Sequence, residues 1–220
     1  YDSLLQSAGH LVLNILLCSV LVMSVYIFVT SNFFFPHANQ HYSDLSKMFL
    51  NGKTYFTSNP SADYSFADCA YFNGSYYWPL GIFPAVLLVP FSFIVQDGYI
   101  QGVVSGVLTI LNFGLLFAIG RKITNDRRKA TYLSISYIFG SAYIFVGLQP
   151  VSWYFAHVVA TTCMLCAIFF TSVREKPFFA GVFFSLSFLS RISTLFGIAF
   201  FVYLLACRDK MRIKENLVKF

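Results

Sequence analysis

The sequence predicts an all-α, polytopic integral membrane protein, and three observations lead to this fold class. Of the 220 residues, 57% are hydrophobic and only 11% are charged, whereas soluble domains carry about 25% charged residues. The mean hydropathy is +0.67, and several apolar runs approach the roughly 20 residues that a helix needs to cross a bilayer. The basic residues gather at the ends of these runs. We therefore expect about 6–7 apolar helices in one transmembrane domain, residues 1–220, with a long external loop after the first helix.

The positive charge is distributed as in a membrane protein rather than as in a nucleic-acid-binding protein. The net charge is +6, and twelve of the 15 Lys and Arg residues fall within residues 121–129, 174–176 and 208–219. Each cluster ends an apolar run, which is the pattern of cytoplasmic loops. No basic stripe with base-reading side chains remains, so we expect no nucleic-acid partner. Three basic residues lie elsewhere: Lys47, Lys53 and Arg191.

The cysteines and the chain ends complete this outline. The five cysteines show neither a metal-binding nor a disulfide framework. Cys163 and Cys166 lie within an apolar run, where the packing of two small polarisable side chains is a simpler interpretation than a redox pair. The chain begins with Tyr1 and stops in a basic tail, so we expect a fragment of a longer protein, truncated at both ends.

The first predicted span covers residues 11–30, and a long polar stretch, residues 31–78, follows it. Within this stretch, residues 41–50 carry apolar side chains at the spacing of an amphipathic helix, namely Tyr42, Leu45 and Phe49. We expect this short helix to lie at the membrane interface and to end at Asn51-Gly52.

Two further features close the polar stretch. Asn73-Gly74 separates two aromatic runs, which predicts a hairpin turn. Residues 79–95 then form an apolar segment that contains three prolines, so we expect a bent or broken helix there.

The rest of the chain alternates between apolar runs and short polar turns. Residues 100–119, 130–148 and 155–173 are each predicted to form a span. Residues 177–207 form an apolar run of 31 residues, which only Ser190-Arg191-Ile192-Ser193 interrupts.

Basic loops are expected on the cytoplasmic side of a membrane, and this charge rule constrains the topology of these runs. If all three basic clusters lie inside, Trp153 and His157 are external, and the last run consists of two short helices that turn at an external Arg191. Residues 79–95 must then begin and end outside. Either this segment is re-entrant, or one loop violates the charge rule.

The polar stretch carries the acidic residues that could serve as catalysts. His41 and Asp44 are three residues apart on the predicted interfacial helix, so they share a face. A carboxylate beside an imidazole could serve as a general base or a metal site, and a solvated polar face is the other interpretation. Asp63 and Asp68 flank aromatic residues in the same stretch, and either could approach the same cleft.

In the second half of the chain, Arg191 indicates a functional site more strongly than the acidic residues of the polar stretch do. An arginine inside an apolar run costs roughly 2.5–3.5 kcal/mol on insertion scales, so it should face water, a partner or an anionic ligand. Phosphate is a natural ligand, because a guanidinium binds it with two parallel hydrogen bonds. The alternative is an arginine that snorkels at an external turn. His157 follows interfacial aromatic residues at the start of a span, where it either packs or binds substrate.

Three stretches follow one another in the order of a known pattern. Residues 41–52 are similar to a "Y-x-x-L-A-x-x-x-L-x-x-G" helix, and residues 71–84 are similar to a "y-x-G-k-x-Y-x-x-x-P-P" segment. Ala180-Gly181 followed by residues 189–193 is similar to "a-G-l-x-x-g-l-a-x-x-[TS]-[RK]". Together they resemble the GT-C superfamily of polytopic glycosyltransferases, which includes protein O-mannosyltransferases and aminoarabinose transferases, and they look closest to uncharacterised bacterial members.

The resemblance implies an inverting sugar transfer from a polyprenyl-phosphate donor to an unknown acceptor, on the external face of a bacterial plasma (inner) membrane. A carboxylate would deprotonate the acceptor, and cationic groups or a divalent metal ion would stabilise the leaving phosphate. We assign catalysis to Asp44 or Asp68 and no residue to metal binding. The residues that we assign to substrate binding are His41, Lys53, Asp63, Tyr77, His157 and Arg191.

One departure from the family pattern concerns the base. Many relatives place an acidic pair just before the helix tyrosine, where this chain has Ala38 and Asn39. Asp44, or Asp68 folded back, must therefore act as the base, or the activity is absent. The alternative function is a transporter or flippase of lipid-linked sugars or another small substrate, which would have inverted repeats and a site between broken helices.

Overall fold

The computed structural model describes residues 25, 39–57, 68–94, 98–149 and 151–204. The predicted span at 11–30, apart from Val25, lies outside these residues, as do Asp63 and the basic cluster at 208–219. The described chain is mostly helical, which confirms the predicted class. Its elements are α2 (His41–Leu50), β1 (Ala70–Phe72), β2 (Ser75–Tyr77), α3 (Phe83–Leu88), η2 (Val89–Phe93), α4 (Ile100–Thr124), α5 (Arg127–Phe139), α6 (Tyr143–Leu148), α7 (Ser152–Ser172), α8 (Pro177–Ser190) and η3 (Ile192–Gly197).

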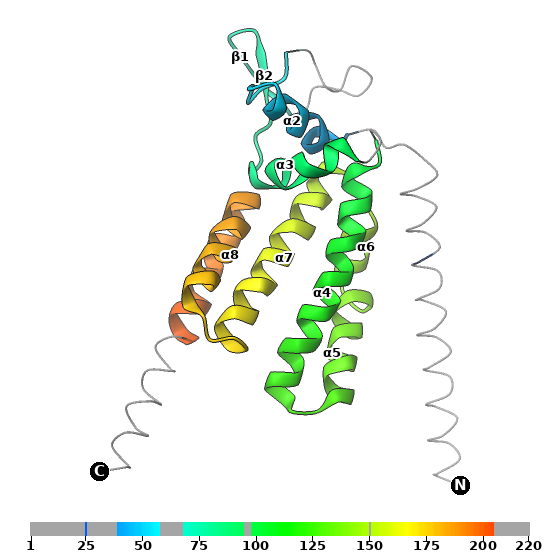
Figure 1. Ribbon diagram of the computed structural model, residues 1–220, viewed down its shortest axis with the longest axis vertical. Coiled ribbons are helices and arrows are strands. Elements are labelled where there is room, and N and C mark those ends of the chain that lie inside the picture. The colour runs from blue at the N-terminus through cyan, green and yellow to red at the C-terminus, as the bar shows by residue number, and fades with distance from the viewer. Residues whose placement is uncertain (1–24, 26–38, 58–67, 95–97, 150, 205–220) are drawn as a thin grey trace.

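Two of the described helices, α4 and α7, are long and apolar enough to cross a membrane. The prediction of about six or seven spans is therefore not supported within the described residues. In Figure 1, α4, α7 and α8 stand side by side, with α7 in the middle. The loops after α4 and after α7 both lie at the lower end, so the two described basic clusters share one end of the bundle, as the charge pattern predicts.

The predicted span at 130–148 is wrong as a single helix. The structure divides it into α5 and α6, which lie one above the other beside α4 (Figure 1). The break has a local cause in Ser141. Its hydroxyl donates to the Tyr137 carbonyl at 2.6 Å and accepts from the Tyr143 backbone N–H at 3.1 Å, so it ends one helix and begins the next.

Helix α2 has the predicted bounds and ends as predicted. Gly52 adopts a left-handed conformation with φ +69°, and its N–H donates to the Phe49 carbonyl at 3.0 Å. The hairpin at Asn73-Gly74 is also confirmed, because β1 and β2 pair in antiparallel fashion on either side of it. Both turn residues have positive φ, at 46° and 78°, which is the geometry that Asn-Gly favours in a two-residue hairpin turn.

The proline-rich segment is broken into α3 and η2, as predicted. It lies crosswise over the upper end of the bundle, between α2 and the tops of α7 and α8 (Figure 1). It is tied to α2 by a 2.7 Å hydrogen bond between the Ser46 and Ser92 hydroxyls. The segment thus begins and ends at one end of the molecule, which removes the conflict between residues 79–95 and the charge rule.

The last described run turns at Arg191. Helix α8 ends at Ser190, Arg191 has extended backbone angles (φ −145°, ψ 115°), and η3 follows. The chain then returns along α8, because the rings of Phe184 and Phe201 are 5.3 Å apart. The prediction of two short helices that turn at Arg191 is therefore confirmed. We call the end of the bundle that carries α2, the hairpin, α3 and Arg191 the polar end.

Candidate functional site

Four side chains form an aromatic cluster at the polar end: His41, Tyr42, Trp78 and Trp153. The imidazole of His41 stacks on the Trp78 indole with 4.2 Å between centroids and 12° between planes. Trp153 approaches both rings, at 6.0 and 6.1 Å, and Tyr42 meets Trp78 edge-on at 5.7 Å. The aromatic cluster therefore joins the start of α2, the exit of the hairpin and the start of α7. It also contains both tryptophans of the chain.

A hydrogen-bonded clasp around Ser152 holds this arrangement. The fully buried Ser152 hydroxyl accepts from the His41 backbone N–H at 2.9 Å and donates to the Asn39 carbonyl at 2.6 Å. The Ser152 N–H donates to the same carbonyl at 3.2 Å. Asn39 adopts the left-handed conformation, φ 61°, that allows its carbonyl to serve both donors. The first turn of α2 is thus fixed to the first turn of α7.

Arg191 is brought to the same end by a close backbone contact. Gly81, which follows the hairpin, packs against the carbonyls of Leu189 and Ser190 at the end of α8. A Cβ at position 81 would lie 2.6 Å from the Ser190 oxygen and closer still to the Leu189 oxygen, so only glycine fits without a shift. The Arg191 carbonyl is held in turn by Thr194, whose N–H and hydroxyl donate to it at 3.0 and 2.9 Å.

The charge of Arg191 acts on two residues of the site. Burial raises the pKa of the Tyr42 phenol to about 12, while the positive charge of Arg191 acts in the opposite direction. The guanidinium is also within electrostatic range of His157. Arg191 itself is half-buried. A half-buried cation beside a neutral phenol gains from an anionic partner, because its own hydration is incomplete.

The imidazole of His41 is neutral at pH 7. Burial lowers its pKa below the ordinary value of 6.5, and the charge of Asp68 and a hydrogen bond with the Asn39 backbone raise it by less. Asp68 is exposed at the entry to β1, and Asp44 is half-buried on α2, one turn from His41. Two predicted acids thus lie at the polar end with His41.

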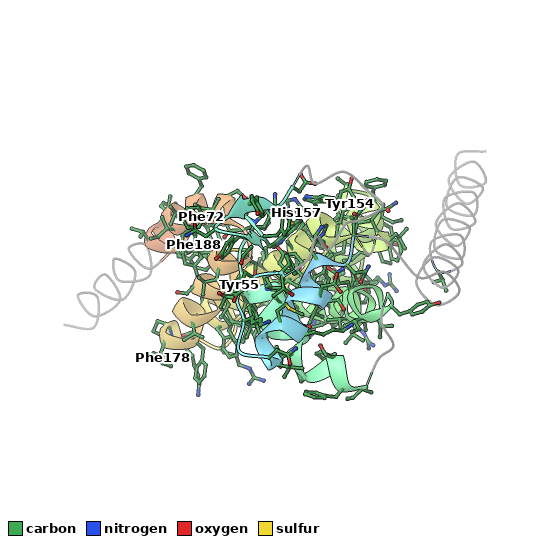
Figure 2. All side chains as sticks on the ribbon, turned by 90° about the horizontal axis from the view of Figure 1, so that it is seen from above. Tyr55, Phe72, Tyr154, His157, Phe178 and Phe188 are labelled. Atoms are coloured by element: carbon green, nitrogen blue, oxygen red, sulfur yellow. The ribbon has the colours of Figure 1, made fainter. Side chains whose placement is uncertain are left out.

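The remaining predicted binding residues are spread over this end. Lys53 is half-buried directly after α2, and its N–H donates to the Met48 carbonyl at 2.8 Å. Tyr77 is half-buried in β2, with its ring 5.8 Å from that of Tyr55. His157 is exposed on α7. Figure 2, which looks down on the polar end, shows it on the same side as Tyr154, whereas Phe178 projects at the opposite periphery.

Sequence reasoning missed four residues that build the site. Trp78 ends an aromatic run and Trp153 belongs to the turn before a predicted span, and neither position indicates that both indoles contact His41 at the start of α2. Gly81 carried a signal, since a glycine between Pro79 and Pro84 in an apolar run indicates a close backbone approach. Ser152 carried none, because its partners are more than a hundred residues away.

The described residues offer oxygen, aromatic and guanidinium groups rather than a metal cluster. Among them, no three His, Cys, Asp or Glu side chains gather closely enough to hold a metal ion. Cys163 and Cys166 are free thiols in α7, and Cys163 is buried, in keeping with a packing role. No known protein family, curated protein or solved structure matches the chain. What the protein does is therefore inferred from its own residues.

Proposed function

We propose that this protein is a membrane glycosyltransferase that transfers a sugar from a polyprenyl-phosphate donor to an acceptor at the polar end. The observation that supports this most directly is the placement of Arg191. Arg191 lies at the turn between the apolar elements α8 and η3, and the charge of its guanidinium acts on Tyr42 of α2 and on His157 of α7. A lipid phosphate is an anion delivered at the membrane surface, and it matches the two-pronged donor geometry of arginine.

The convergence of three sequence stretches supports the same proposal. Residues 41–52, 71–84 and 189–193 carry the resemblance to GT-C glycosyltransferases. In the structure, the first two meet through the stack of His41 on Trp78, and the second meets the third through Gly81. Residues that are far apart in the sequence thus lie together at one end, as a shared site requires.

The proposed reaction needs one base and one cation. The carboxylate of Asp44 or Asp68 takes the proton of the acceptor hydroxyl, and the acceptor oxygen attacks the anomeric carbon of the donor sugar. The bond from that carbon to the phosphate oxygen breaks, so the configuration inverts. Polyprenyl phosphate leaves with the bonding electron pair, and the charge of Arg191 stabilises it.

Binding of the phosphate can be measured with the tryptophans already present. Full-length protein in nanodiscs is titrated with a polyprenyl phosphate, and the emission of Trp78 and Trp153 is followed. The corresponding polyprenyl alcohol lacks the phosphate and should bind weakly. Hydrogen bonds to charged groups contribute about 1.5–3 kcal/mol, so Arg191→Gln should weaken binding of the phosphate by roughly 10–150-fold.

Arg174→Gln is the matched control for this titration. It removes the same charge from an exposed position at the opposite end of the bundle. If both variants bind the polyprenyl phosphate as tightly as the wild type, the proposed role of Arg191 is wrong.

Transfer itself tests the base. Polyprenyl-phosphate sugars are supplied to the full-length protein with cell-envelope acceptors, and Asp44→Ala, Asp63→Ala and Asp68→Ala are compared with the wild type. We expect one of them to lower the rate by about 10²–10⁴-fold, the usual contribution of a general base. Wild-type rates in all three would remove the carboxylate mechanism.

A transporter or flippase of lipid-linked sugars is the second candidate, and the polar interior of α4 favours it. Gln101, Ser105 and Asn112 are fully buried on this candidate span, and buried polar side chains within a membrane often mark a substrate path. Interhelical bonding is the other role, because Ser105 donates to the Gly147 carbonyl at 3.2 Å and Asn112 to the Tyr143 hydroxyl at 2.7 Å. Movement of a fluorescent lipid-linked sugar across vesicles without sugar transfer would favour the transporter.

A further inference from the structure

The segment formed by α3 and η2 has an unusual surface for a connection at the polar end. From Pro79 to Ile94 the sequence contains no Asp, Glu, Lys, Arg or His, and Ser92 is its one side chain with a hydroxyl or amide. The segment does not cross the bundle but lies over its upper end (Figure 1). An apolar segment in that position must be covered either by protein or by lipid.

One face of this segment is covered by protein. Pro84, Ala85 and Leu88 are buried, and Ala85 and Leu88 belong to the core that also contains Tyr42 of α2 and Phe155 of α7. Ser92 is turned toward α2, because its hydroxyl bonds to that of Ser46 at 2.7 Å and to the Leu88 carbonyl at 3.2 Å. The one hydroxyl of the segment is thus used for internal packing.

The other face is apolar and exposed. The exposed fractions are 45% for Ile82, 47% for Val86, 73% for Phe93 and 81% for Ile94. We call these residues, together with the exposed Pro90, the exposed stripe of α3–η2. A water-facing helix of this kind would carry polar side chains on its outer face, as α2 does with the half-buried Asp44 and Lys47.

The segment contacts a candidate span that also exposes an apolar surface. Helix α4 begins at Ile100 and exposes further large apolar side chains, among them Val107 and Ile110, at 60% and 75%. On a helix that crosses a membrane, such side chains face acyl chains. We propose that the exposed stripe of α3–η2 is a lipid-contact surface, and that this segment lies in the plane of the bilayer, just below the headgroups at the polar end.

This placement has a consequence for the site, which rests on the proposed function. Gly81, at the start of the segment, touches the carbonyls of Leu189 and Ser190 beside Arg191. Lipid that covers the stripe therefore reaches the level of Arg191. A polyprenyl chain could lie along α3–η2 within the bilayer while its phosphate meets the guanidinium.

The lipid contact is tested by the accessibility of nitroxide labels on the full-length chain in liposomes. Single cysteines are placed at Ile82, Val86, Phe93, Ala85 and Leu88 in a background without the native cysteines. We expect labels at 82, 86 and 93 to collide readily with dissolved oxygen and poorly with a water-soluble nickel chelate, as a label at Ile110 of α4 does. Labels at 85 and 88 should be shielded from both, and a label at Asn73 in the hairpin turn should favour the nickel chelate.

Two outcomes would overturn the inference. Nickel accessibility at 82, 86 and 93 equal to that at Asn73 would place the stripe in water. Shielding of these positions from both reagents would mean that another protein surface, such as a second copy of the chain, covers them. Phe93→Trp in vesicles of brominated phospholipid gives a second measurement that keeps the native cysteines, and its emission should be quenched more than that of Asn73→Trp. Because none of these readouts needs a sugar donor, the lipid contact can fail or hold independently of the glycosyltransferase proposal.

Discussion

Substitution of Gly81 by alanine tests whether the polar end is assembled by the contact between the α3 segment and the turn at Arg191. The added methyl group would meet the backbone of the α8 terminus on three atoms, which are the carbonyl oxygens of Leu189 and Ser190 and the carbonyl carbon of Leu189. Backbone atoms cannot rotate away as the end of a flexible side chain can. The two segments must therefore separate.

The required shift gives the magnitude. The Ser190 oxygen would have to retreat by about 0.8 Å, from 2.6 Å to the 3.4 Å at which ordinary contact begins, and the Leu189 oxygen by more. Overpacking of this kind costs about 1–3 kcal/mol. For a chain of this size each kcal/mol lowers the melting temperature by about 2–4 °C, so Gly81→Ala should melt roughly 2–12 °C below the wild type.

The assay is thermal unfolding in detergent, followed by circular dichroism, with Gly181→Ala as the matched control. Gly181 lies on α8 itself, and a Cβ there would meet nothing within 4 Å. Alanine at this helical position should leave the melting temperature unchanged or raise it, because alanine favours the helix by about 0.5–1 kcal/mol. If Gly81→Ala melts within a degree of Gly181→Ala, the contact between Gly81 and the Arg191 turn does not hold the polar end together.

Two further substitutions probe the start of α2. Ser152→Ala leaves the His41 N–H without its hydroxyl acceptor in a fully buried place. It should cost about 1–3 kcal/mol of stability, measured by the same thermal unfolding. The control is Ser185→Ala at an exposed position, which loses only a hydrogen bond within α8 and should have little effect. Because burial lowers the pKa of His41, the unfolded state binds a proton at this imidazole more readily than the folded state does. The contribution of His41 to the stability of the fold is therefore fully present above about pH 6.5, and it is lost as the pH falls from there toward the lower pKa of the folded state. His41→Phe, which retains a ring against Trp78, should therefore flatten the fall in melting temperature below pH 6.5, and the same fall in both proteins would show that His41 does not cause it.

The parts of the fold that the sequence predicts well are those with a local cause. The bounds of α2 follow from the spacing of Tyr42 and Leu45 and from the left-handed Gly52, and the hairpin follows from Asn73-Gly74. The turn at Arg191 follows from the cost of a guanidinium in an apolar run. In each case the deciding residues lie within one or two turns of the structure that they determine.

The errors and omissions arise where the cause is hidden or distant. The run at 130–148 is predicted as one span because hydropathy averages over Ser141, whose hydroxyl divides α5 from α6. The clasp between Ser152 and Asn39 and the contact of Gly81 with α8 depend on the tertiary fold. Only the charge rule bore on the position of residues 79–95 across the top of the bundle. It left two solutions open, namely a re-entrant segment or a loop that violates the rule.

The placement of this segment also bears on which face the proposed site would serve. Because α3 and η2 do not cross the bundle, α2 and the hairpin lie at the same end as Arg191, opposite both described basic clusters. The reverse orientation would expose residues 121–129 and 174–176 on the external side, against the positive-inside rule. We therefore expect the polar end to be external. An external arginine at the level of the lipid headgroups would meet a polyprenyl-linked sugar only after the lipid had been turned to that side, so the proposed transferase depends on a separate activity that flips its donor.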